Sequence, residues 1–352
     1  MQRKAFLQLL STLLKTHSPS GDEAEIDRLL LPLFEQYCDE VWQDDAGNII
    51  GRMRGNGLRQ PVRVLAHKDE IGAIVKRIDP DGRLVLCGLG ASMPWRYGEG
   101  PMDVLVNGQV LTGILSVGAN HISEETKTVY EARFSKPLSW EMVRLDLKVS
   151  KEKLSAIGVR AGTRAVVSRS RKSLTQLGDY VAGWALDDKG ALAIMLQVME
   201  MLKSKPSALP QDVYFVASGG EEVRISGGAF AARTLPGDVL IAVEVAPVAE
   251  EYGIVNSAQP VLIYKDRQSI YHKQTTDVLF LLAEQLGLGC QAAVVSAFSS
   301  DASYASSYGY TGKAVCLCFP TENTHGYEIA NLKAMENTAK LLATYLSNES
   351  SE

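Results

Sequence analysis

Apolar runs of strand length alternate with helical patterns through the second half of the chain, and this alternation constrains the fold more than any other feature. Four helices are predicted after Gly178: Lys189–Lys203, near Gly227–Arg233, Thr275–Leu286 and a closing helix over Ile329–Leu346. Four strands are predicted among them: Val213–Ala217, Leu240–Val245, Gln291–Ala297 and Lys313–Phe319. Such alternation is typical of a sheet that helices cover on both faces.

The start of the chain has the same character as the second half. Met1–Lys15 and Glu23–Cys38 repeat apolar residues at helical spacing, and Val62–Ala66 is a short apolar run typical of a buried strand. Between them, Glu40–Met53 is typical of a hairpin that turns at Asp45–Asn48. We therefore assign these segments to the same α/β domain as the second half.

The stretch between these two parts is rich in short β-like runs that Gly, Pro and Asn separate. The runs are Leu84–Cys87, Val104–Val110, Leu145–Val149 and Arg164–Ser168. The predicted fold class is α/β: a three-layer αβα catalytic domain with a mixed sheet, formed by residues 1–75 and 178–352. A small, barrel-like, β-rich domain at residues 76–177 interrupts it.

The composition excludes several classes of partner. Of 352 residues, 46% are apolar and 22% are charged, as in ordinary globular proteins. The 36 basic and 41 acidic residues are mixed along the chain, so no block of charge indicates binding to nucleic acid or to a membrane surface. No apolar run approaches the roughly 20 residues that span a bilayer. Small or peptidic partners are expected.

The cysteines indicate neither disulfides nor a thiolate metal site. There are five of them, an odd number, and none has CxxC spacing. Cys316 and Cys318 lie two apart in an apolar strand, where core packing is the expected role. A reducing, cytoplasmic location is the expectation that follows.

His67 and Asp69 follow the predicted strand Val62–Ala66. Ligands bind at the carboxyl ends of strands in sheets of this kind. A histidine there can offer one ring nitrogen to a metal ion, while a neighbouring carboxylate accepts the N–H of the other. Taken alone, the motif favours a strand that simply runs into a polar turn.

Two pairs of adjacent carboxylates also stand at the ends of predicted elements. Asp187 and Asp188 precede a helix, where an aspartate could simply cap the helix. Glu221 and Glu222 follow a strongly apolar strand and two glycines, and such a pair is costly unless it is solvated, protonated or bound to metal.

Glu244 and His325 complete the set. Glu244 lies within an apolar strand, where a buried carboxylate needs a partner or a metal ion, although an edge strand that faces water is an alternative. His325 lies in a loop after the cysteine-containing strand, and alone it would be a surface histidine. Together these segments supply two histidines and several carboxylates, a set that suits zinc, cobalt or manganese better than calcium or magnesium.

In this order the motifs resemble the TET-type aminopeptidases, also called the glutamyl aminopeptidase family. The matching residues are Ser18-Pro19-Ser20-Gly21, His67-x-Asp69-Glu70, Asp187-Asp188, Glu221-Glu222 and Pro320-Thr321 with His325. The resemblance implies a peptidase with two divalent metal ions per subunit, zinc in the first instance. It also implies a peptide substrate, and an inserted domain that mediates dimerisation within homo-oligomers such as dodecamers.

The resemblance also implies a role for each site residue. Asp187 bridges both ions, Glu222 and His325 complete one metal site, and His67 and Glu244 complete the other. Asp69 orients His67, and Glu221 acts as the general base. His121, in the insert, is a candidate for stabilising the oxyanion in a neighbouring subunit.

Three residues depart from the family pattern. Glu244 stands where the family usually has Asp, Lys68 occupies a usually apolar position, and Arg224 replaces a common Gly. The last two changes are expected to alter the charge of the cleft.

Two other functions stay open at the level of sequence. The substitution at Glu244 is compatible with a carboxypeptidase or an N-acyl deacylase that uses the same metal ions. A non-catalytic binding or scaffold protein of the same fold is the second alternative.

Overall fold

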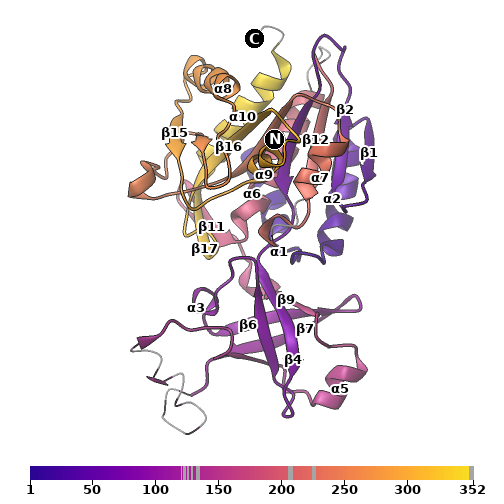
Figure 1. The fold of residues 1–352 in the computed structure, drawn as a ribbon, viewed down its shortest axis with the longest axis vertical. Coiled ribbons are helices and arrows are strands. Elements are labelled where there is room, and N and C mark those ends of the chain that lie inside the picture. The colour runs from indigo at the N-terminus through magenta and orange to yellow at the C-terminus, as the bar shows by residue number, and fades with distance from the viewer. Residues whose placement is uncertain are drawn as a thin grey trace. The chain divides into compact units, whose positions relative to one another are not determined.

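The computed structural model describes residues 1–348 except 120, 122–123, 125–126, 128–129, 132–134, 205–208 and 224–226. The chain forms two compact units (Figure 1). The larger unit comprises Met1–Asp69 and Leu174–Glu352, and the smaller one comprises Glu70–Ser173. That the two parts act as a catalytic and a dimerisation domain stays a prediction.

The larger unit is built on a mixed sheet of 11 strands. Nine of them follow one another in the order β1 (Glu40–Gln43), β2 (Ile49–Met53), β12 (Val213–Ser218), β3 (Val62–His67), β13 (Val239–Pro247), β16 (Lys313–Glu322), β17 (Tyr327–Asn331), β11 (Tyr180–Trp184) and β10 (Thr175–Leu177). The remaining two, β14 (Val261–Lys265) and β15 (Gln291–Val294), pair with each other, and β14 also pairs with β16. The central strands β12, β3, β13 and β16 run parallel.

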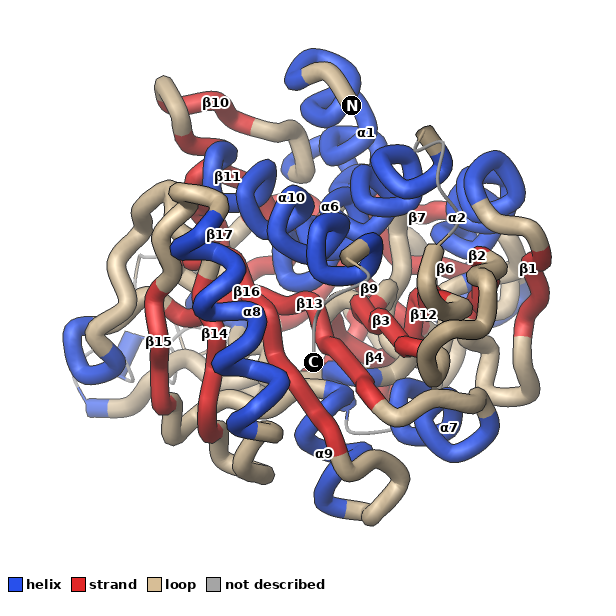
Figure 2. The backbone as a smooth tube through the Cα atoms, turned by 90° about the horizontal axis from the view of Figure 1, so that it is seen from above, coloured by secondary structure: helices blue, strands red, loops and turns tan. Residues whose placement is uncertain are grey.

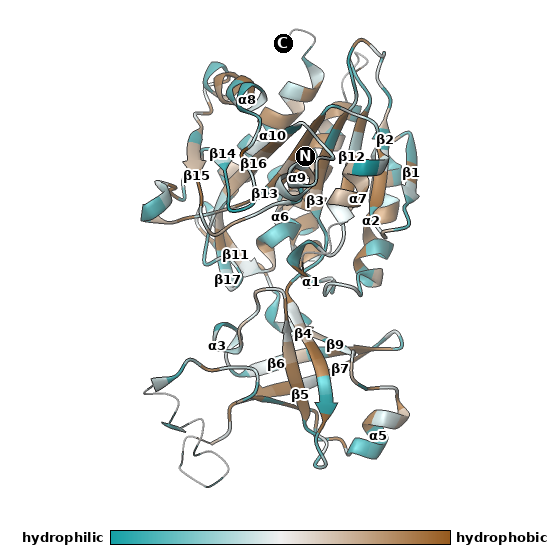
Figure 3. Ribbon diagram, in the orientation of Figure 1, coloured by the Kyte–Doolittle hydropathy of each residue, from teal (hydrophilic) through white to brown (hydrophobic). Residues whose placement is uncertain are grey.

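Helices cover both faces of this sheet (Figure 2). One face packs against α1 (Arg3–Lys15), α2 (Ala24–Tyr37), α6 (Leu186–Lys203), α8 (Lys273–Gln285) and α10 (Leu332–Ser347). The other face packs against α7 (Gly227–Thr234) and α9 (Asp301–Ser307). Alternate residues of β3 serve the two layers: Val64 and Ala66 face the first, and Leu65 faces the second. The central strands are therefore mostly apolar (Figure 3).

The smaller unit is a closed, antiparallel barrel of six strands. Its strands follow the order β4 (Gly72–Ile78), β5 (Leu84–Leu89), β8 (Arg144–Asp146), β7 (Gln109–Ser116), β6 (Gly100–Val106) and β9 (Arg164–Val167). The described helices of this unit are the short α3 (Pro94–Tyr97) and α5 (Lys151–Ala156). The mixed sheet and the inserted barrel confirm the predicted fold class.

Two predicted elements have wrong bounds for a local reason that the structure shows. The run Val104–Val110 is the end of β6 and the start of β7, because Asn107 and Gly108 take positive φ values of 50° and 75° and turn the chain into a hairpin. The closing helix does not begin at Ile329, which belongs to β17. It begins after Asn331, whose side chain accepts hydrogen bonds from the N–H groups of Lys333 and Ala334.

Five strands of the described residues have no counterpart in the prediction. They are β4, β10, β11, β14 and β17. Among the helices of the described residues, none is both long and apolar enough to cross a membrane.

Candidate metal centre

The seven predicted site residues come together at one edge of the large sheet. His67 ends β3, Glu221 and Glu222 follow β12 directly, and Glu244 lies in the last half of β13. These strands are adjacent and parallel, so their carboxyl ends meet at the same edge. The other members enter from neighbouring loops: Asp69 after β3, Asp187 between β11 and the regular part of α6, and His325 between β16 and β17.

Asp187 lies between the two histidines. Its Oδ1 is 3.0 Å from Nε2 of His67, and its Oδ2 is 3.4 Å from Nε2 of His325. Nε2 of His325 is also 3.5 Å from Oε2 of Glu222. On the other side, Nε2 of His67 lies 3.8 Å from Oε1 of Glu244 and 4.0 Å from Oε2 of Glu221. One carboxylate thus presents a separate oxygen atom to each half of the cluster.

Asp69 holds three segments of this cluster in place. Its Oδ1 accepts a hydrogen bond from the N–H of Glu221 at 3.0 Å, and its Oδ2 accepts one from the N–H of Glu222 at 3.2 Å. The hydroxyl of Ser20 donates to Oδ2 at 2.7 Å. Nδ1 of His67 lies 3.1 Å from the backbone oxygen of Asp69 and 3.5 Å from Oδ1. The fully buried Asp69 therefore fixes both the ring of His67 and the turn that carries the glutamate pair.

Glu328 plays a similar part on the opposite side, and sequence reasoning missed it. Its Oε2 accepts a hydrogen bond from the N–H of Asp187 at 3.1 Å, and its Oε1 accepts one from the N–H of His325 at 2.9 Å. The side chain is buried, with 1% exposed. The available signal was a glutamate three residues after His325, but Glu328 stands just before the predicted helix Ile329–Leu346 and was given no role.

Asp188 also belongs to the centre. Its Oδ2 accepts a hydrogen bond from the N–H of His67 at 3.1 Å. Two groups of side chains in the described chain bring possible ligand atoms within 4.8 Å of one another: His67, Asp187 and Glu222, and His67, Asp188 and Glu244. The peptide bond between Asp187 and Asp188 is cis, and neither residue has helical backbone angles.

The geometry decides two alternatives that the sequence left open. Capping of α6 does not explain the aspartate pair, because Asp187 faces the histidines and Asp188 bonds to the backbone of His67. Glu244 is not on an edge strand, because β13 lies between β3 and β16. It is 4% exposed.

Burial and crowded charge shift the pKa values of this centre strongly. Burial, together with the charge of Asp187, raises the pKa of Glu222 to about 8 despite the opposing effect of His325. Burial also raises the pKa of Glu221 and of Glu244 well above the usual range. Burial alone would lower the pKa of His325, but the carboxylates of Glu222 and Asp187 outweigh burial and raise this pKa to about 10. Protons therefore compensate the negative charge when no cation does.

The residues present fit divalent metal ions. Besides Asp69 and Glu328, which accept backbone N–H groups, five carboxylates and two imidazoles converge here: Asp187, Asp188, Glu221, Glu222, Glu244, His67 and His325. This mixed oxygen and nitrogen donor set suits zinc and related ions. Two buried oxygen atoms, Oδ1 of Asp188 and Oε1 of Glu222, have no hydrogen-bond partner among the described residues. Buried polar atoms without a partner are costly, and a bound cation would satisfy both.

Two of the departures from the family pattern, Lys68 and Arg224, were expected to change the charge of the cleft. Lys68 is buried, and its ammonium pairs with Asp27 of α2 and donates to the carbonyl of Gly47 at 2.6 Å. Its charge is thus directed to α2 rather than to the metal centre, so the predicted change in cleft charge does not come from Lys68. Arg224 lies outside the described residues. His121 is exposed in the smaller unit, and its catalytic role stays a prediction.

Comparison with known proteins assigns the chain to a family. The model of the M42 glutamyl aminopeptidases matches residues 47–341, most of the chain. The chain belongs to the M42 glutamyl aminopeptidase family. It is therefore a metallo-aminopeptidase of that family, as the motifs suggested.

Relatives of the M42 protein match it along nearly its whole length. The putative aminopeptidase YhfE of Bacillus subtilis is 24% identical over 347 residues, which cover 97% of this chain and 96% of that protein. The fold is similar to that of aminopeptidase APDkam598 from Desulfurococcus kamchatkensis (TM-score 0.85, 25% identity, 98% and 95% of the two chains). It is also similar to PhTET1-12s, a dodecamer (TM-score 0.84, 20% identity, 98% and 99%).

The position of Glu328 leads to a first prediction. Glu328→Gln replaces one acceptor oxygen with an NH₂ group, which cannot accept the N–H of Asp187 or of His325. We expect metal affinity to fall by about 10–100-fold, as for other residues that orient metal ligands. Titrating peptidase activity against added metal ion measures this, and excess metal should restore most of the rate. Glu336→Gln, on the surface of α10, is the matched control; equal metal dependence in the two variants would exclude the role assigned to Glu328.

Proposed function

We propose that this M42 protein is an aminopeptidase with two metal ions, which removes N-terminal residues from short peptides. In this proposal Asp187 bridges the ions, with Glu222 and His325 on one side and His67 and Glu244 on the other. The observation that carries it is the position of Asp187, whose two carboxylate oxygens face two different histidines at 3.0 and 3.4 Å. A single-ion site needs only one of these oxygens.

Bound divalent ions would supply an activated water and polarise the scissile carbonyl. We infer that Glu221 acts as the general base. Two observations support this role: its Oε2 lies 4.0 Å from Nε2 of His67, and Asp69 accepts a hydrogen bond from its backbone N–H. Burial and the neighbouring charges of Asp301 and Glu222 raise its pKa, so the carboxylate takes up a proton readily and can deliver it to the leaving amine.

Asp69 and Asp188 support this arrangement through His67. Asp69 approaches Nδ1 of His67, which leaves Nε2 available for a metal ion. Asp188 holds the backbone of His67 through its N–H. Zinc is the ion that we propose, with cobalt and manganese as alternatives, because the donor set contains imidazole as well as carboxylate.

We also propose that the chain assembles into a homo-oligomer of dimers, up to a dodecamer. The support is the similarity to PhTET1-12s, a dodecamer, over nearly the full length of both chains. The mass of the particle in solution tests this, with one chain contributing 38.3 kDa. A monomer at micromolar concentration would contradict it.

A substrate panel tests the proposed function directly. Metal-loaded enzyme is given three forms of one short peptide: free at both ends, N-acetylated, and amidated at the C-terminus. We expect the free and the amidated peptides to lose their N-terminal residue and the acetylated peptide to stay intact. Release of the C-terminal residue, or removal of the acetyl group, would replace the aminopeptidase with a carboxypeptidase or a deacylase.

The raised pKa values predict that metal binding releases protons. At pH 7 Glu222, with a pKa of about 8, and His325, with a pKa of about 10, hold protons in the metal-free site. A metal ion needs both groups deprotonated, so its affinity should rise with pH by about tenfold per unit for each proton released. Calorimetric titration in two buffers of different ionisation enthalpy, between pH 6 and 8, measures the number. Affinity that does not change with pH would contradict these protonation states.

A further inference from the structure

Two buried side chains meet where β12 passes into the segment Gly219–Glu222, which we call the glutamate turn. Ser218 is the last residue of β12, and Asp301 is the first residue of α9. The hydroxyl of Ser218 donates a hydrogen bond to Oδ2 of Asp301 at 2.5 Å. Ser218 is fully buried, and Asp301 is 3% exposed. A hydrogen bond to a carboxylate is stronger than one between neutral groups, and burial keeps water from replacing it.

The carboxylate of Asp301 reaches this position because α9 has a fixed first turn and α7 leaves space for it. Ser300, which precedes Asp301, forms a capping box with Ser303. Oγ of Ser300 also lies 2.8 Å from the hydroxyl of Tyr271. On α7, a Cβ atom at Gly228 would lie only 2.2 Å from Cγ of Asp301. Glycine at position 228 therefore permits the close approach of the carboxylate.

Two other buried residues hold the glutamate turn by its backbone. Oδ1 of Asn48 accepts a hydrogen bond from the N–H of Gly219 at 3.1 Å, and Nδ2 of Asn48 donates to the carbonyl of Gly227 at 2.9 Å. Asp69 accepts the N–H groups of both glutamates. The hydroxyl of Ser218 anchors the preceding residue, at the end of the strand. Each anchor thus fixes a different part of the segment, and the loss of one leaves a freedom that the others do not remove.

Asp301 also acts on Glu221 through space. Burial is the main cause of the raised pKa of Glu221, and the negative charge of Asp301 adds to it. The carboxylate of Asp301 is thus a neighbour of the glutamate turn by charge as well as by its hydrogen bond. A purely structural role is the alternative, because an acidic residue in the first turn also stabilises a helix. That role requires neither burial nor a contact with Ser218.

We propose that Asp301 is a positioning residue of the metal centre, which fixes the glutamate turn through the hydroxyl of Ser218. The consequence for catalysis, which rests on the proposed function, is that this contact orients both the general base and a metal ligand. Without the contact the turn shifts. The base then reaches its reactive position less often, and the ligand holds its ion more weakly.

Kinetics of Ser218→Ala and Asp301→Asn, alone and together, test this position at saturating zinc. Each single variant should lower kcat about 10–100-fold on an aminoacyl substrate and leave KM within about twofold, because the change displaces the base rather than the groups that bind substrate. Both changes disrupt the same contact. The double variant should therefore be no slower than the slower of the two single variants.

Zinc affinity provides a second readout, which does not depend on the reaction. The metal-loaded enzyme is titrated with a chromophoric chelator, and the variants should release an ion at a chelator concentration about 10–100-fold lower than the parent does. Thermal unfolding of the same samples measures stability. A purely structural role would lower the unfolding temperature and leave kcat and zinc affinity at their parental values.

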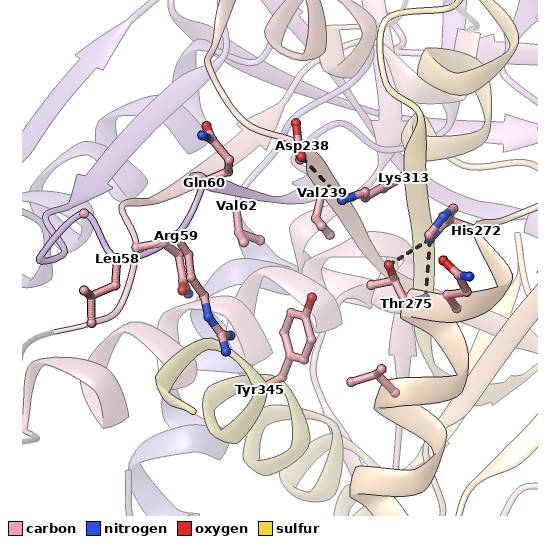
Figure 4. A pocket seen from close by; sticks show the side chains of 14 residues that line it. Leu58, Arg59, Gln60, Val62, Asp238, Val239, His272, Thr275, Lys313 and Tyr345 are labelled. Carbon is pink, nitrogen blue, oxygen red and sulfur yellow. Dashed lines mark hydrogen bonds and ion pairs between the residues drawn. The ribbon is translucent and has the colours of Figure 1, made fainter. Parts of the chain in front are cut away.

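Matched controls use the same changes at exposed positions. Asp238, just before β13, pairs with Lys313 at 3.4 Å, and both residues line a cavity away from the glutamate turn (Figure 4). Asp238→Asn is the control for Asp301→Asn. Ser204→Ala, at the exposed end of α6, is the control for Ser218→Ala. Both controls should keep the parental kcat and zinc affinity.

The proposal is overturned if Ser218→Ala keeps the parental kcat and zinc affinity, or if the losses in the two single variants multiply in the double variant. Ser218→Ala removes a single oxygen atom, so it decides the question alone if Asp301→Asn does not fold. A parent enzyme that cleaved no aminoacyl substrate would contradict the proposed function instead. The zinc affinities would still show whether Asp301 holds the turn.

Discussion

Replacement of Glu221 by Gln is expected to lower kcat by about 10²–10⁴-fold, the usual contribution of a general base. Glutamine has nearly the same shape but cannot take the proton. The backbone N–H of residue 221 would still donate to Asp69, so the turn that carries Glu222 should keep its position. Steady-state kinetics on an aminoacyl substrate give kcat, and elemental analysis gives the metal content, which should equal that of the parent.

The matched control for this variant is Glu251→Gln, the same change at an exposed glutamate of the short helical turn Glu250–Tyr252. It should keep the parental rate. If Glu221→Gln also kept the parental rate, another group would have to serve as the base. If it lost both metal ions, Glu221 would be a ligand and its assignment would change.

Asp187→Asn should lower activity by as much as Glu221→Gln or more, because it weakens metal binding and leaves the base in place. The amide has one oxygen where the carboxylate has two, so it cannot serve both the side of His67 and the side of His325. We expect metal content to fall from two ions per chain to at most one. Activity should fall on the order of 10³-fold or more, because metal ions contribute several kcal/mol to transition-state stabilisation.

The surface residue Asp179 provides the comparison for Asp187. It pairs with Arg3 at 3.2 Å and its side chain is 76% exposed, so Asp179→Asn should change neither metal content nor activity. Circular dichroism of both variants checks that the fold is kept. Two retained ions and full activity in Asp187→Asn would exclude a bridging role.

The sequence predicts the architecture because the pattern that carries it is local. Each central strand is an apolar run between turn residues, and each covering helix repeats apolar residues every three or four positions. The order of strands and their direction are not local properties. The strands β11 and β14 were missed for the same reason, because their partners β17 and β16 are distant in the chain.

The sequence predicted which residues form the site and approximately where in the fold they lie. His67, Glu221 and Glu222 follow apolar strands that are parallel neighbours, so their convergence follows from the fold. The residues that hold the ligands were harder to find. Glu328 acts through two backbone N–H groups, and such contacts leave no mark in the spacing of the chain. The sequence also could not predict that Lys68 pairs with Asp27, because Asp27 belongs to a helix about forty residues earlier.

The family resemblance implied a role for Asp187 but none for the side chain of Asp188. The non-helical backbone at Asp187 and Asp188 brings both carboxylates to the same cluster. Helix propensities do not predict these non-helical backbone angles.

The most direct test of the metal centre is anomalous diffraction from crystals of the metal-replete enzyme, measured at the absorption edge of the bound ion. We predict two peaks about 3.5–4 Å apart, one beside His67 and one beside His325, each about 2.0–2.2 Å from a different oxygen of Asp187. A single peak, or two peaks that Asp187 does not contact, would contradict the bridged centre.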